Sequence, residues 1–145
     1  MNPLRRALLG VAAALLLKPF AALAAWHKEA FGAKSAPDAL KSLGVANAAP
    51  SQDVVIEAPQ IAENGAVVPV EITSNVKGTT SILVLIDKNP FPLVGKFDFA
   101  EGALPFIKVN LKMGETSDVR VLAEAGGKHY FATREIKVTI GGCGG

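Results

Sequence analysis

The stretch Val68-Pro-Val-Glu-Ile-Thr73 alternates apolar and polar residues, with Val68, Val70 and Ile72 on one side. Successive side chains of a β-strand point to opposite faces, so this alternation predicts a strand with one buried face. The same period of two recurs at residues 107–112 and 118–124. We therefore expect these segments to form the framework of a β-sheet protein.

Four further segments have the length and composition of strands, namely 53–58, 81–87, 128–133 and 134–140. Residues typical of turns separate the segments, at Glu63-Asn-Gly65, Asn75–Thr79, Asn89–Pro92 and Gly126-Gly127. Short strands broken by turns at this spacing predict an all-β fold, an immunoglobulin-like antiparallel β-sandwich. We place this domain at residues 51–140.

The segment Ser81-Ile-Leu-Val-Leu-Ile-Asp87 is apolar on both faces, so Leu83 and Leu85 point away from the core that its other residues fill. A central strand covered on both sides would explain this, and so would contact with a second subunit. The following Pro90-Phe-Pro-Leu93 adds apolar surface, which favours the subunit interface. Its predicted residues are Leu83, Leu85, Phe91 and Leu93.

An N-terminal helical segment and linker precede the sandwich, at residues 25–50. Ser35-Ala-Pro-Asp38 predicts a helix start, because serine can cap, proline fits the first turn and Asp38 favours the positive end of the helix dipole. Gly44 predicts the end of this helix. The segment could dock on the sandwich or on a partner.

Two arginines, Arg5 and Arg6, precede an apolar run at residues 7–17 that is followed by small residues. This pattern predicts a signal peptide at residues 1–24, with Ala25 as the alternative cleavage position. The run is too short to span a bilayer, for which about 20 apolar residues are needed. The paired arginines suggest twin-arginine export, but the serine before such a pair and the phenylalanine after it are missing. We expect no membrane association after cleavage.

Removal of residues 1–24 would remove three basic residues and no acidic one, leaving 12 basic and 13 acidic residues and a net charge of −1. This balance lacks the basic patch of a nucleic-acid-binding protein. The carboxylates are dispersed, and His27 and His129 lie far apart in the sequence, so we predict no catalytic residue, metal site or cofactor. The remaining 121 residues suffice for one domain with its own core.

The sequence ends in Gly141-Gly-Cys-Gly-Gly145, which places its only cysteine, Cys143, on a flexible C-terminal arm. Glycine has no Cβ, so Gly141, Gly142, Gly144 and Gly145 give the cysteine backbone freedom and no side-chain shielding. Three extended residues at roughly 3.3–3.6 Å each carry the sulfur about 10 Å beyond Ile140. Such an arm cannot hold a Cys–His pair together, so a covalent carrier thiol fits better than a catalytic nucleophile.

The ending Val138-Thr-Ile-Gly-Gly-Cys-Gly-Gly145, with Ala62-Glu-Asn-Gly-Ala-Val-Val-Pro-Val70 and Lys88-Asn-Pro-Phe-Pro-Leu93, resembles the SoxY family of sulfur carriers. The resemblance extends over essentially the whole mature chain. It implies that Cys143 covalently holds thiosulfate-derived sulfur in the periplasm. It also implies a heterodimer with a SoxZ-like subunit, and partner enzymes of the Sox pathway that conjugate, hydrolyse and oxidise the bound sulfur. The chain would then be a carrier and not an enzyme.

A second class of function is open, a structural or interaction β-sandwich whose Cys143 forms an intermolecular disulfide. An added labelling tag or an inert end would also place a cysteine between glycines. A thiol-disulfide oxidoreductase is disfavoured, because a second cysteine is missing.

The glycines on both sides of the thiol generate a prediction. Replacing Gly142 and Gly144 with valine, while keeping Cys143, should slow enzymatic loading, because the branched side chains add bulk and restrict the backbone. A loss of about 1.4 kcal/mol of transition-state stabilisation would slow loading roughly tenfold. Reaction with a small thiol reagent, followed by mass spectrometry, is the control and should hardly change. Wild-type loading of the double variant would contradict the threading role of the glycines.

Overall fold

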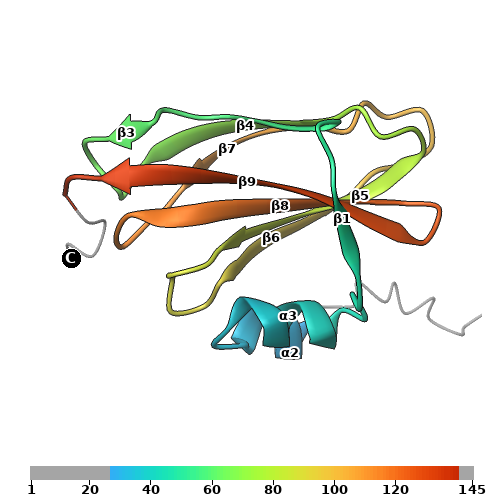
Figure 1. Ribbon diagram of the computed structural model, residues 1–145, viewed down its shortest axis with the longest axis horizontal. Helices are drawn as coiled ribbons and strands as arrows, with labels where there is room; N and C mark the ends of the chain where they lie inside the picture. The colour runs from blue at the N-terminus through green and yellow to red at the C-terminus, as the bar shows by residue number, and fades with distance from the viewer. Residues whose placement is uncertain (1–26, 141–145) are drawn as a thin grey trace, which may run out of the picture.

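The computed structural model describes residues 27–140, which form two β-sheets packed face to face with two short helices below the larger sheet (Figure 1). The larger sheet has the order β1-β9-β8-β5-β6, with β3 also paired to β9, and the smaller has the order β2-β4-β7. The strands are β1 (Ala48–Pro50), β2 (Val54–Glu57), β3 (Ile61–Ala62), β4 (Val68–Ser74), β5 (Thr79–Ile86), β6 (Leu93–Asp98), β7 (Phe106–Leu111), β8 (Ser117–Ala125) and β9 (Lys128–Val138). The all-β sandwich predicted from the sequence is confirmed.

The core lies between the two sheets and is built from the alternating residues of the predicted strands. In β4, Val68, Val70 and Ile72 are fully buried, and the residues between them are more exposed. From the larger sheet, β5 contributes Ile82 and Val84 to the same cluster. The period of two in the sequence therefore marks the faces that meet.

Four strands differ from the sequence prediction. The segments 128–133 and 134–140, predicted as two strands, form the single strand β9, because no turn interrupts its ladder with β8. Strand β6 was not predicted, since its alternation is irregular and its ladder with β5 shifts register between Val84 and Leu85. Strand β1 falls in the predicted linker and pairs in parallel with β9. Strand β3, which was also not predicted, pairs in parallel with β9 as well.

The helices are α2 (Lys28–Gly32) and α3 (Ala36–Ser42). Helix α3 starts as predicted, because the Ser35 hydroxyl accepts a hydrogen bond from the Asp38 backbone N–H at 3.2 Å. It ends before Gly44, whose φ of 74° suits glycine. The predicted start and stop of this helix are both confirmed.

The helices cover the second apolar face of β5, which corrects the predicted subunit interface. Leu83, Leu85 and Leu93 are at most 4% exposed and form a cluster with Leu122 and three alanines of α2 and α3, namely Ala30, Ala36 and Ala39. These leucines are not accessible to a second subunit in this structure. The apolar face that suggested an interface is an inner layer of the chain's own fold, and β5 is covered on both sides.

Phe91 is the one member of the predicted interface set that stays accessible. Its side chain is 47% exposed, and the Lys34 ammonium lies 3.7 Å from its ring centroid. This cation–π contact ties the N-terminal segment to the turn between β5 and β6.

The covered face generates a stability prediction. In the isolated chain, Leu85→Ala should lower the free energy of unfolding by about 2–5 kcal/mol, because it leaves a cavity under the helices. Val94→Ala, at a residue that is 38% exposed in the neighbouring strand, is the control and should change it by no more than about 0.5 kcal/mol. Urea unfolding measures both. Equal, small effects would mean that the helices do not cover this face.

Candidate functional site

The candidate site is the end of β9, from which the C-terminal segment continues. Cys143 and its four flanking glycines lie outside the described residues, as does the predicted signal peptide. We therefore describe the site up to Ile140 and call residues 137–140 the arm root. Ile140 is 69% exposed, so the last described side chain projects into solvent.

One edge of the arm root is held by residues 60–65, which include β3. Figure 1 shows β3 beside the C-terminal end of β9. The backbone N–H groups of Lys137 and Thr139 donate to the carbonyls of Gln60 and Ala62, at 3.0 and 3.1 Å. The Gly65 N–H then donates to the Ile140 carbonyl at 2.9 Å. This edge is therefore hydrogen-bonded up to the last described residue.

The opposite edge of the arm root is held by a side chain. Strand β8 begins only at Ser117, and the Val138 N–H donates to the Thr116 hydroxyl at 2.9 Å. The Thr139 hydroxyl also donates to the Glu63 carbonyl at 3.2 Å. The Thr116 side chain thus extends the hydrogen bonding between β8 and β9 by one bond. Backbone groups on both edges of β9 therefore have hydrogen-bond partners beyond the end of the regular sheet.

The turn that contacts Ile140 is itself anchored. The Gly65 carbonyl accepts a hydrogen bond from the Met113 N–H at 2.7 Å, and the Asn64 side-chain oxygen accepts one from the Ala66 N–H at 2.9 Å. Met113 is fully buried in the core between the sheets. The stretch Ala62–Val70, one of those that carry the family resemblance, therefore links the arm root to the core.

A cavity of about 490 Å³ lies close to this end of the sandwich. Its lining is mostly apolar and comes largely from β6 and β7, each of which lies at one edge of its sheet. Asn89 and Gly114 also line it, and the Asn89 side-chain oxygen accepts a hydrogen bond from the Gly114 N–H. The cavity therefore adjoins the loops that support the arm root.

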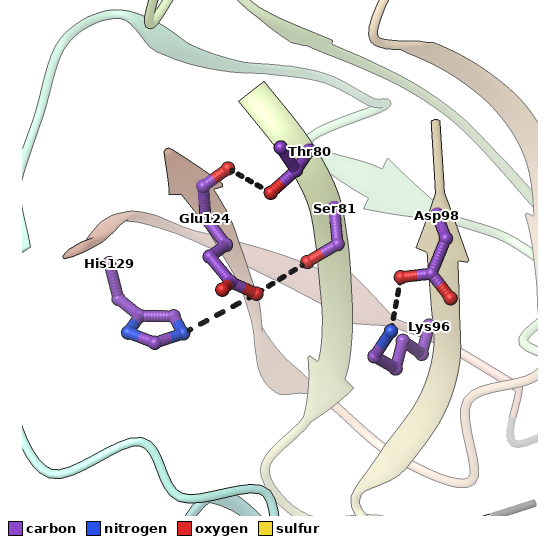
Figure 2. A network of polar contacts seen from close by, with 6 residues as sticks. All are labelled: Thr80, Ser81, Lys96, Asp98, Glu124 and His129. Carbon is purple, nitrogen blue, oxygen red and sulfur yellow. Dashed lines mark hydrogen bonds and ion pairs between the residues drawn. The ribbon is translucent and has the colours of Figure 1, made fainter. Parts of the chain in front are cut away.

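Figure 2 shows a separate polar network around Glu124, near the β8–β9 turn and at the other end of β9 from the arm root. The Ser81 hydroxyl donates to the Glu124 carboxylate at 3.0 Å, and His129 Nε2 lies 3.9 Å from the same carboxylate. Ser81 is 3% exposed and bonds to the acid rather than to the histidine. This geometry lacks the Ser–His contact that activates a nucleophile.

Within residues 27–140, His, Asp and Glu side chains form no group of three or more that could hold a metal ion. Neither described helix is long and apolar enough to cross a membrane.

The fold and the arm root define the class of protein, a β-sandwich that hydrogen-bonds the base of its C-terminal segment on both edges. The family model described as Sulfur oxidation protein SoxY matches residues 40–143. The chain therefore belongs to the SoxY family, whose members act as sulfur carriers in sulfur oxidation. The matched range includes all nine described strands and ends at Cys143.

A solved structure agrees with this assignment. The sulfur carrier protein SoxY from Chlorobium limicola f thiosulfatophilum is 37% identical, with a TM-score of 0.66 over 72% of this chain and 96% of that chain.

Two other similarities have TM-scores of 0.40 and 0.41 and carry no argument. One is to a chain from a structure of T cell activation by the superantigen toxic shock syndrome toxin-1, at 16% identity over 59% of this chain and 98% of that one. The other is to an engineered protein, at 17% identity over 60% and 20%. No curated protein sequence matches the chain significantly.

The sequence pattern assigns no role to Thr116 or Met113, and it marks Gly65 only as part of a turn. Two of them act through backbone atoms, and all three contact segments distant in sequence. The resemblance at residues 62–70 marked the right region, but it assigned no role to it.

The two-sided grip on the arm root generates a prediction. Thr116→Val keeps the side-chain shape but leaves the Val138 N–H without its acceptor, which costs about 1–3 kcal/mol. NMR hydrogen exchange at the Val138 amide should quicken more than exchange at the Phe99 amide, which donates to Thr80. Thr73→Val is the matched control, because no hydrogen bond of the Thr73 side chain is found among the described residues. Unchanged protection of Val138 would show that Thr116 does not hold the root.

Proposed function

We propose that this chain carries thiosulfate-derived sulfur covalently on Cys143 and presents it to the enzymes of the Sox pathway. The family match carries this proposal, because it extends to Cys143, the only cysteine of the sequence. The geometry supports it further. The cysteine lies three residues beyond Ile140, whose carbonyl is hydrogen-bonded to Gly65.

The proposed loading step forms a disulfide bond between Cys143 Sγ and the outer sulfur of thiosulfate. The thiol loses its proton and the pair loses two electrons, which an electron-accepting partner enzyme takes up. Water then cleaves the bond between this thiosulfate sulfur and the sulfonate sulfur. The sulfonate leaves as sulfate, and a persulfide remains on Cys143. This second step transfers no electrons to an acceptor.

In this proposal the partner enzymes supply the activation of the thiol. A cysteine becomes a strong nucleophile beside cations or a helix N-terminus, whereas the sequence around Cys143 offers only glycines. A thiol of ordinary reactivity suits a carrier, because thiolate character also promotes unwanted oxidation.

The proposed compartment is the periplasm, reached with residues 1–24 as a signal peptide for the twin-arginine or the general secretory route. The proposed partner is a SoxZ-like subunit in a heterodimer. Since Leu83, Leu85 and Leu93 are buried, the partner must contact other residues, and Phe91 is an accessible candidate. Co-purification of the mature chain with such a subunit tests the pairing.

The test of the carrier function is Cys143→Ser. Loading by the conjugating enzyme in the presence of thiosulfate should be abolished, because serine cannot form the disulfide, and intact mass spectrometry measures it. The unfolding temperature should stay within about 1 °C, since a cysteine flanked by glycines is expected to lie outside the core, where substitutions cost little. The Leu85→Ala chain, which keeps Cys143, is the control for loading under destabilisation.

Two outcomes would contradict the proposal. One is normal loading of the serine variant. The other is a wild-type chain that gains no thiosulfate-derived mass and instead forms a disulfide-linked pair, which would support a structural role for Cys143.

A further inference from the structure

Asn89 lies in the turn between β5 and β6, within the stretch Lys88–Leu93, and its side chain holds a different loop. The side-chain Nδ2 donates to the Lys112 carbonyl at 2.8 Å, and Oδ1 accepts from the Gly114 N–H at 3.4 Å. The two contacts lie on either side of Met113 in the sequence. The Asn89 side chain therefore fixes the backbone on both sides of Met113, the residue that contacts the turn beside the arm root.

Backbone hydrogen bonds connect Met113 to the arm root through Gly65. The Met113 N–H donates to the Gly65 carbonyl at 2.7 Å, and the Gly65 N–H donates to the Ile140 carbonyl at 2.9 Å. The Met113 side chain is fully buried, so the loop cannot shift without disturbing the core. A continuous path of contacts thus leads from Asn89 to the base of the arm.

The turn that carries Asn89 is firmly held. The Asn89 backbone N–H donates to the Ile86 carbonyl at 3.1 Å, and the Ile86 N–H donates to the Pro92 carbonyl at 2.8 Å. The Lys88 N–H donates to the Ser117 hydroxyl at 3.0 Å. Pro90 and Pro92 have fixed φ angles, which limit the freedom of the turn further. Asn89 can therefore act as a fixed point.

We propose that Asn89 is a positioning residue for the carrier arm, which sets through Met113 and Gly65 where the arm leaves the body. The inference rests on the proposed carrier function. It concerns how partner enzymes find the sulfur, and it leaves the intrinsic reactivity of the thiol unchanged.

The chemistry of the position explains why an asparagine stands there. The Lys112 carbonyl needs a donor and the Gly114 N–H needs an acceptor, and a side-chain amide supplies both. Aspartate keeps the acceptor but loses the donor, and alanine loses both. The two substitutions therefore form a graded series.

The experiment compares Asn89→Ala with Asn110→Ala in the full chain. Asn110 is an exposed asparagine of β7 and no hydrogen bond of its side chain is found within residues 27–140. NMR hydrogen exchange at the Gly65 and Met113 amides is measured against the Phe99 amide, which follows the last residue of β6. In Asn89→Ala, exchange at the first two should quicken about tenfold more than at Phe99. In Asn110→Ala it should not.

A second readout separates positioning from stability. For Asn89→Ala, kcat/KM for loading by the conjugating enzyme should fall several-fold, while the rate with a small thiol reagent stays unchanged. Asn89→Asp should fall between alanine and wild type, and it replaces alanine if that variant does not fold.

Equal quickening at all three amides would overturn the proposal, because Asn89 would then act on global stability only. Local quickening with wild-type kcat/KM would also overturn it. If the wild-type chain itself is not loaded, the carrier function fails, whereas a variant-specific loss of loading concerns Asn89 alone.

Discussion

The fold depends on the burial of β5 on both of its faces. One face contributes Ile82 and Val84 to the core between the sheets, and the other places Leu83 and Leu85 under α2 and α3. Burying such a side chain contributes about 1.5–3 kcal/mol. Helices of five and seven residues are not stable alone in water, so they need this leucine surface as much as it needs them.

The double burial of β5 also fixes the position of the arm root. Strand β8 pairs with β5 on one edge and with β9 on the other, so the core determines the register of β9. A slip of one residue would turn the fully buried Ile136 outward, which the core does not allow. The hydrogen bonds from Thr116 and from residues 60–65 then fix the position of the strand end as far as Ile140.

The sequence predicted features that depend on local patterns. The alternation in β4, β7 and β8 and the Ser35 cap are local, and they were predicted correctly. The packing of α2 and α3 over Leu83 and Leu85 was not predicted. Hydrophobic burial has no preferred partner, so an apolar strand face can be covered equally well by a helix or by a second subunit.

The arm root shows the same division. Cys143 could be singled out from the sequence, since a lone cysteine between glycines is a local feature. The contacts of Thr116, Gly65 and Asn89 could not, because backbone groups carry no sequence signal and their partners lie up to 75 residues away.

If Cys143 carries sulfur as proposed, the hydrogen-bonded arm root has a physical advantage. Three extended residues would carry this sulfur at most about 10 Å from Ile140. The volume open to it would then be small, and its effective concentration at a docked enzyme would be high. If the root itself moved by several ångströms, this volume would grow with the cube of the reach, and the concentration would fall accordingly. In the proposed carrier function, the hydrogen bonds that hold Ile140 would therefore influence the encounter between sulfur and enzyme without touching the thiol.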